Sequence, residues 1–243
     1  MTSLLVSLLL AAVPTIIAIT LHEAAHGYAA LAMGDDTARR AGRLSLNPLA
    51  HVDRVGTILL PGFLLIMQLL TIHRVAFMFG WAKPVPVAAW RFRNPRRGMM
   101  VVAAAGPAMN FLLAWIGALG LHIVPWLGAI PQGQSAVLLF LFYFMLANIV
   151  LGVFNLLPVP PLDGGRIVVG ILPLPLAQAW ARLERVGIVL VILVVFLAPA
   201  ILRSAGVDFD PIRALFDAVA GPAFTLILAL AGHPAAGAAL LGQ

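Results

Sequence analysis

Residues 22–26 read HEAAH and interrupt one of the most apolar stretches of the chain. On a helix, His22 and His26 lie one turn apart on the same face, so both imidazoles can reach a single metal ion. Glu23 stands beside the first of them, where its carboxylate can take a proton from a water molecule at the metal. Ionisable groups at membrane depth are costly and usually functional. The pattern therefore predicts a catalytic metal site, and a tolerated polar patch near a helix end is the alternative.

Catalytic zinc takes three protein ligands and leaves one position open, so a third ligand must come from elsewhere. Asp163 is the best candidate, because it directly follows an apolar run and precedes two glycines in NLLPVPPLDGGRI (155–167). A plain turn is the alternative reading of this motif, since Pro, Asp and Gly all favour turns. The other aspartates that we considered are Asp35, Asp36, Asp53, Asp208, Asp210 and Asp217. One Zn²⁺ ion with Asp163 and Glu23 ionised and both histidines neutral has no net charge, which lowers its cost at membrane depth.

The elements that must position these residues are membrane helices. The chain has 243 residues, of which 62% are hydrophobic and 10% charged, whereas soluble domains carry about 25% charged residues. Its apolar runs have the length of membrane helices and lack the alternation of barrel strands. We therefore expect an all-α polytopic protein embedded in the lipid bilayer. The formal charge of +6 does not indicate nucleic acid, because the arginines flank the apolar runs, as they do at a cytoplasmic membrane face.

Five apolar runs and a weaker sixth predict four to six membrane helices. They cover residues 3–33, 55–72, 99–124, 134–157, 186–202 and 212–232. The first run has no basic segment before it and no cleavage site, so we expect a helix in preference to a signal peptide. The last run is predicted either to cross or to lie at the interface. With no internal repeat, no linker and no cysteine, the chain is predicted to be one membrane domain over 1–243, with a core over 1–170 and accessory helices over 180–243.

The distribution of basic residues indicates the topology. Thirteen of the 15 basic residues lie in three stretches: 34–54, 73–98 and 158–185. Residues 1–33 and 123–134 hold none. The positive-inside rule places all three basic stretches in the cytoplasm, which requires that 55–72 re-enters the membrane instead of crossing it. Gly56, Pro61 and Gly62 are expected to break a helix in this run. That arrangement also brings Asp163 to the same leaflet as the two histidines. A crossing 55–72 is the alternative.

Two segments near the predicted site lack a helical pattern. Pro84 and Pro86 flank Val85 in RVAFMFGWAKPVPVA (74–88), and GRLSLNP (42–48) alternates apolar and polar residues. Prolines in strands belong at sheet edges. We expect a small membrane-associated β-hairpin at the cytoplasmic face, with two structured loops as the alternative.

With these motifs the sequence resembles the site-2 protease family of intramembrane zinc metalloproteases. The resemblance rests on HEAAH (22–26) and NLLPVPPLDGG (155–165). Three further segments reinforce it in the family's order: GRLSLNPLAHVD (42–53), GWAKPVPV (80–87) and AGPAMN (105–110). It implies a minimal form of the family, without a PDZ or CBS domain, and a single metalloprotease domain.

The resemblance implies a role for each matching residue. The zinc ligands would be His22, His26 and Asp163, and Glu23 would be the general base. Asn155 would hydrogen-bond the substrate backbone or the developing oxyanion, with a helix cap as the alternative. Asn110 would position the substrate or pack within the bundle.

Two other features complete the comparison with the family. The segment 80–87 would correspond to the family's β-hairpin and would offer a strand edge to an unwound substrate. Arg54 and Ala88 depart from the family's motifs but lie outside the predicted metal site.

The expected function is hydrolysis of a peptide bond within or near the transmembrane segment of a membrane protein. The protein is expected in the cell membrane as a multi-pass protein, with its N-terminus outside and its active site opening towards the cytoplasm. A metal or proton transporter is one alternative, although its ionisable groups would be spread over both leaflets. A catalytically inactive family member is the other. The remaining histidines have no partner at ligand spacing and are expected in loops or at helix ends: His51, His73, His122 and His233.

Overall fold

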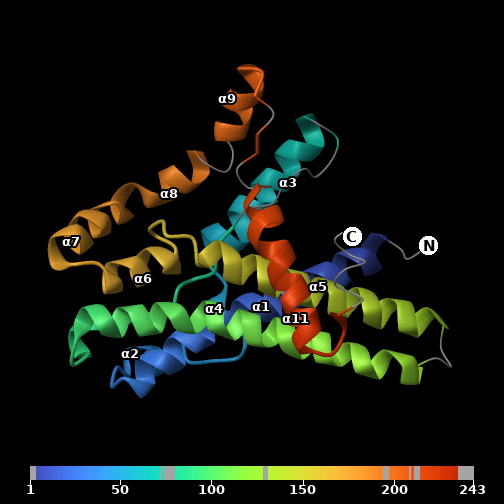
Figure 1. The fold of residues 1–243 in the computed structure, drawn as a ribbon, viewed down its shortest axis with the longest axis horizontal. Coiled ribbons are helices and arrows are strands. Elements are labelled where there is room, and N and C mark those ends of the chain that lie inside the picture. Colours follow the sequence, from blue (N-terminus) through green and yellow to red (C-terminus); the bar gives the residue numbers. More distant parts are fainter. Residues whose placement is uncertain are drawn as a thin grey trace.

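The computed structural model describes residues 4–71, 73, 80–127, 131–193, 197–207, 209–210 and 214–234. Three long helices run side by side and form a bundle (Figure 1): α1 (Leu4–Ala32), α4 (Pro95–Gly120) and α5 (Pro131–Asn155). Shorter α-helices connect and cover them: α2 (Thr37–Arg40), α3 (Leu60–Thr71), α6 (Asp163–Ile171), α7 (Leu174–Arg182), α8 (Glu184–Ile192), α9 (Ala198–Ser204) and α11 (Gly221–Leu230). The remaining helical turns are η1 (Pro48–His51), η2 (Arg54–Leu59), η3 (Ala89–Arg91), η4 (Leu121–Leu127) and η6 (Phe216–Ala220).

Small residues let the bundle helices approach one another. Ala114 and Ala118 on α4 are completely buried, and they pack in one cluster with Met145 and Ile149 of α5. A Cβ on Gly117 would lie 3.0 Å from the Met145 side chain, so the two helices are in close contact. Lipid tails are as apolar as these side chains, and membrane helices therefore associate through close packing at small residues.

Four helical segments among the described residues are long and apolar enough to cross a membrane. They are Leu9–Ala32, Arg54–Thr71, Pro95–Pro125 and Ala136–Asn155. They correspond to the first four apolar runs of the sequence, and they confirm the prediction of an all-α polytopic protein. The prediction of two further crossings stays a prediction, since residues 194–196 and 211–213 lie outside the described residues.

The segment 54–71 is helical throughout. Gly56, Pro61 and Gly62 were expected to break a helix here, and that expectation is wrong. Pro61 has no N–H to donate within this helix, and the carbonyl of Gly56 accepts instead from the N–H of Trp81 at 3.2 Å. η2 is a π-helix, which has wider turns than an α-helix, and it changes to the α-helix α3 at Leu60. α3 projects away from the bundle (Figure 1), and whether it crosses or re-enters stays a prediction.

The described residues contain no β-strand, so the predicted hairpin is wrong for 42–48 and 80–88. Residues 74–79 lie outside the described part. We call residues 80–88 the strap. The strap is extended, but several of its N–H groups donate to partners that do not belong to a strand. Lys83 N–H donates to the His51 carbonyl, and the N–H groups of Val85 and Ala88 donate to side-chain carboxylates. The prolines in the strap have no N–H, so no ladder forms.

The C-terminal helices cover the bundle. α11 crosses α4 and α5 (Figure 1), and its residues Ile227 and Leu228 are buried in the same cluster as Ile149. The division into a core over 1–170 and accessory helices over 180–243 stays a prediction.

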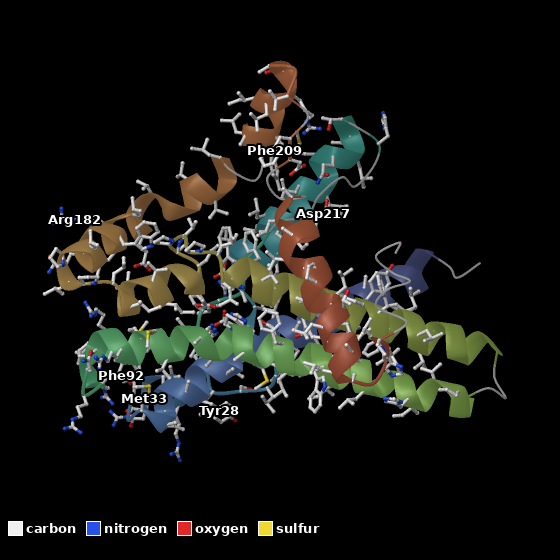
Figure 2. The ribbon with its side chains drawn as sticks, in the orientation of Figure 1. Tyr28, Met33, Phe92, Arg182, Phe209 and Asp217 are labelled. Atoms are coloured by element: carbon white, nitrogen blue, oxygen red, sulfur yellow. The ribbon has the colours of Figure 1, made fainter. Side chains whose placement is uncertain are left out.

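One end of the bundle collects the basic stretches. Met33 after α1, Phe92 before α4 and Arg182 at the end of α7 all lie towards this end (Figure 2). Together with Arg182, the stretches around these residues contribute eight arginines: Arg39, Arg40, Arg43, Arg91, Arg93, Arg96, Arg97 and Arg182. These arginines therefore gather towards one end of the bundle, and the side of the membrane that this end faces stays a prediction.

Candidate metal centre

Three side chains from two helices converge at one point. His22 and His26 lie on successive turns of α1, and Asp163 is the first residue of α6. The two Nε2 atoms are 3.0 Å apart, and Asp163 Oδ2 lies 3.2 Å from His22 Nε2 and 3.3 Å from His26 Nε2. Tetrahedral zinc with ligands at about 2.0–2.1 Å separates its ligand atoms by about 3.3 Å, so the triangle matches one face of such a tetrahedron. The structure thus brings together the three residues that the sequence predicted as ligands.

Each histidine is oriented through its other ring nitrogen. His22 Nδ1 lies 2.6 Å from Asn110 Oδ1, and His26 Nδ1 lies 2.7 Å from the carbonyl oxygen of Val102. Because both partners accept hydrogen bonds, both Nδ1 atoms carry the proton and both Nε2 atoms present a lone pair to the centre. Asp163 Oδ2 is buried there and has no hydrogen-bond partner in the described part of the chain. Three acceptor atoms that face one another without a donor fit a bound cation.

The orientation of Asn110 is set by a polar chain across three helices. Its Nδ2 donates to Asn148 Oδ1 at 2.9 Å and to the Ala18 carbonyl at 3.4 Å, which turns its Oδ1 towards His22. Asn148 in turn donates to the carbonyl of Phe144 at 2.8 Å. Asn110 and Asn148 are both completely buried. These contacts favour a role for Asn110 in orienting His22 over direct contact with substrate.

Gly106 on α4 makes room for the two imidazoles. A Cβ at this position would lie 2.5 Å from Nε2 of His26 and 2.6 Å from Cε1 of His22. No side chain fits there unless the histidines move. From the sequence, Gly106 was identified only as part of AGPAMN, and Asn148 was not identified. An asparagine within an apolar run was the available signal for Asn148.

Two glycines bring Asp163 to the centre. A Cβ on Gly164 would lie 2.2 Å from the carbonyl oxygen of Leu157, and one on Gly165 would lie 2.5 Å from the nitrogen of Pro160. α6 can therefore begin directly against the loop that follows α5. Its first residue, Asp163, is only 7% exposed. The motif that looked like a plain turn thus presents a buried carboxylate to α1.

Glu23 is partly buried and contacts the strap. Its Oε2 accepts a hydrogen bond from the N–H of Val85 at 3.1 Å. Its Oε1 accepts none from the described residues, so it is available to a water molecule.

Asn155 is the last residue of α5. Its Nδ2 donates to the Leu151 carbonyl of the same helix at 3.0 Å, and no contact among the described residues joins it to the three converging side chains. The predicted hydrogen bond to substrate stays a prediction.

The other candidate ligands have different partners. Asp35 binds N–H groups near the strap, Asp36 pairs with Arg40 and Arg91, and Asp53 caps η2. Asp208 lies outside the described residues. His51 contacts the Ser45 carbonyl, His122 contacts the Ala231 carbonyl, and His73 is exposed.

Comparison with known proteins gives two matches. The sequence model of Peptidase family M50 matches residues 128–198, a range that includes Asp163. YwhC of Bacillus subtilis (strain 168), which carries the provisional name of a zinc metalloprotease, is 36% identical over 219 residues. The match covers 85% of this chain and 90% of that protein. No solved structure matches the chain.

Proposed function

The chain belongs to peptidase family M50, the site-2 proteases, and is an intramembrane zinc metalloprotease; on this premise we propose that His22, His26 and Asp163 bind the zinc ion and that Glu23 is the general base. The observation that carries this assignment is the triangle of three acceptor atoms with both Nδ1 atoms held by other acceptors. The zinc ligands leave the fourth tetrahedral position open for the reaction.

The reaction is hydrolysis of a peptide bond. When bound, zinc supplies Lewis acidity, which polarises the scissile carbonyl and lowers the pKa of a water molecule. Glu23 takes a proton from the attacking water at Oε1 and delivers it to the nitrogen of the leaving amine. Meanwhile the N–H of Val85 holds Oε2 of the same carboxylate. Asn110 and the Val102 carbonyl keep the two imidazoles in the tautomer that binds metal.

The substrate is a protein in the membrane, as for the family. A peptide bond in an intact helix is shielded by its own turn, so the scissile segment must unwind locally. The freed backbone groups then need partners, because the bilayer interior supplies none. Asn155 provides one such partner, and the carbonyl groups of the strap provide others. Both lie next to elements that carry the metal centre.

The protein is a multi-pass membrane protein, with its N-terminus outside and its active site open to the cytoplasm. Support comes from the basic stretches that meet at one end of the bundle (Figure 2). By the positive-inside rule that end faces the cytoplasm. α1 then runs inwards and carries HEAAH towards the cytoplasmic leaflet.

The test is cleavage of a single-pass membrane protein in proteoliposomes by the wild type and by Glu23→Gln. The amide cannot accept the proton of water, so cleavage should fall at least about 100-fold, while zinc content and thermal stability stay at wild-type values. Glu184→Gln is the matched control, because Glu184 is the one other glutamate in the chain and pairs with Arg166 at the surface. It should cleave like the wild type. Unchanged cleavage by Glu23→Gln would refute the assignment.

A further inference from the structure

The strap touches the proposed general base directly. The N–H of Val85 donates to Glu23 Oε2 at 3.1 Å. Val85 stands between Pro84 and Pro86, which have no N–H, so this part of the strap has one donor and directs it at Glu23. The Val85 side chain is 8% exposed. It seats against Gly27, where a Cβ would lie 3.2 Å from Val85 Cγ1.

The N-terminal half of the strap is anchored to the loop that follows α2. The N–H of Lys83 donates to the His51 carbonyl at 2.9 Å, and the N–H of Trp81 donates to the Gly56 carbonyl at 3.2 Å. The guanidinium of Arg43 donates to the Lys83 carbonyl. The Thr57 hydroxyl also donates to the Trp81 carbonyl at 2.9 Å, and these hydrogen bonds together fix this half.

The C-terminal half is anchored by Asp35. The N–H of Ala88 donates to Asp35 Oδ2 at 2.6 Å. The other oxygen of this carboxylate accepts from the N–H of Thr37 at 3.0 Å and from its hydroxyl group, and Arg91 Nε lies 3.8 Å away. Asp35 is completely buried, and all of these contacts are to other groups of the protein.

The charge of Asp35 is stabilised by its donors. Burial alone would raise the pKa of Asp35, but the Thr37 hydroxyl, the N–H groups of Ala88 and Thr37, and the charge of Arg91 together bring the pKa below its usual value. Asp35 therefore stays ionised and keeps accepting from the strap at neutral pH.

We propose that the strap positions Glu23 for catalysis and that Asp35 holds the C-terminal half of the strap in place. This inference rests on the proposed role of Glu23 as the base. A glutamate has three side-chain torsions, and one fixed donor on Oε2 removes most of their freedom and leaves Oε1 to face the water. Displacement of a reacting group by about 1 Å can cost about 100-fold in rate. Asp35 acts through Ala88 and Val85, so it is a positioning residue.

The first test replaces one carboxylate at a time. Asp35→Asn replaces one of the two carboxylate oxygens by a donor, so either the N–H of Ala88 or the N–H of Thr37 loses its acceptor and the anchor of the strap should weaken. We expect kcat to fall about 10-fold or more, with KM within about twofold of wild type and zinc content unchanged. Asp36→Asn is the matched control, because Asp36 pairs with Arg40 and Arg91 and makes no contact with the strap. Its kcat should equal that of the wild type.

A second variant removes the donor itself and does not depend on how Asp35→Asn folds. Replacing Val85 by 2-hydroxyisovaleric acid changes the N–H to an ester oxygen and keeps the side chain. The same replacement at Val87 is the control, because the N–H of Val87 donates to no described group. We expect kcat to fall about 10- to 100-fold for the ester at 85 and to stay unchanged for the ester at 87.

The outcomes separate this inference from the proposed function. If Glu23→Gln abolishes cleavage but neither Asp35→Asn nor the ester at 85 lowers kcat, the positioning role is wrong and the base assignment stands. A loss of zinc in step with the loss of kcat in the ester at 85 would also overturn the positioning role. If Glu23→Gln cleaves normally, the proposed base itself is wrong.

Discussion

Two pairs of close histidines lie along the bundle. Beside the middle part of α4, the ring centroids of His22 and His26 are 4.6 Å apart. Beyond the C-terminal end of α4, those of His122 and His233 are 4.2 Å apart. By distance alone the second pair would be the better candidate for a shared metal ion.

The contacts of the rings separate the two pairs. His22 and His26 give their Nδ1 atoms to acceptors and turn both Nε2 atoms to Asp163. His122 instead places its Nε2 against the Ala231 carbonyl at 2.7 Å. No carboxylate joins His122 and His233 in the described part of the chain. Two close imidazoles therefore make a zinc site only when acceptors hold their Nδ1 atoms and a third ligand joins their Nε2 atoms.

The largest effect is expected from the ligands themselves. His26→Ala and Asp163→Asn each remove one of three protein ligands, so zinc content should fall from about one ion per chain to near zero. Cleavage should become undetectable. His122→Ala is the matched control and should keep both zinc and cleavage. Metal analysis of the purified proteins checks this, and a loss of zinc in His122→Ala would reverse the comparison.

A smaller effect is expected from the acceptor behind His22. Asn110→Leu keeps the size of the side chain but leaves Nδ1 of His22 without its partner. The dissociation constant for zinc should rise about 10- to 100-fold. Chelator competition measures it. Asn155→Leu should leave zinc affinity unchanged and lower cleavage, because Asn155 contacts its own helix and not a metal ligand. Equal zinc affinity in Asn110→Leu and wild type would contradict the orienting role.

The space beside the histidines is a third point of difference. Gly106→Ala puts a methyl group 2.5 Å from His26 Nε2. Overpacking of this kind costs about 1–3 kcal/mol, and we expect zinc affinity to fall about 10-fold and the melting temperature to decrease. Gly62→Ala on α3 is the control, because nothing lies within 4 Å of its added Cβ. If Gly106→Ala binds zinc like the wild type, the space that Gly106 leaves beside the two histidines is not needed for zinc binding.

The smallest effect concerns pH at the second pair. Burial and then the neighbouring His122 lower the pKa of His233 from its usual 6.5. The folded protein then stays neutral at His233 while the unfolded chain takes up a proton. The free energy of unfolding therefore decreases as the pH falls from 6.5 towards the lower pKa that His233 has in the folded protein.

Thermal unfolding of zinc-free protein at about pH 7.5 and about pH 5.5 measures this contribution. The wild type should lose slightly more stability on acidification than His233→Gln, by less than about 3 °C in melting temperature. An equal decrease in melting temperature in both proteins would show that unfolding does not change the protonation of His233.

Several features of the metal centre could be predicted from the sequence. The spacing in HEAAH is a property of the helix itself, so it placed His22 and His26 on one face. Asp163 was identified by combining composition with topology, because only one arrangement of the apolar runs brings it to the same leaflet. The apolar runs predicted four to six membrane helices, and four candidate spans among the described residues correspond to the first four runs.

Other features depend on contacts between distant segments, which a sequence pattern does not reveal. The strap was predicted as a strand, yet Glu23 and Asp35 take its N–H groups. Asn148 and Gly106 act through tertiary packing against residues far away in the chain. Pro61 looked like a helix breaker because the contact between the Gly56 carbonyl and the N–H of Trp81 was not evident from the sequence.

The zinc K-edge X-ray absorption spectrum of the purified protein is the most direct measurement of the central claim. The account predicts two imidazole nitrogens together with oxygen donors, all at about 2.0–2.1 Å. We also expect His122→Ala to leave the spectrum unchanged. His26→Ala should abolish the spectrum, because this variant no longer binds zinc. A spectrum with three or more imidazoles, or one that changes in His122→Ala, would contradict the assignment of His22, His26 and Asp163 as the zinc ligands.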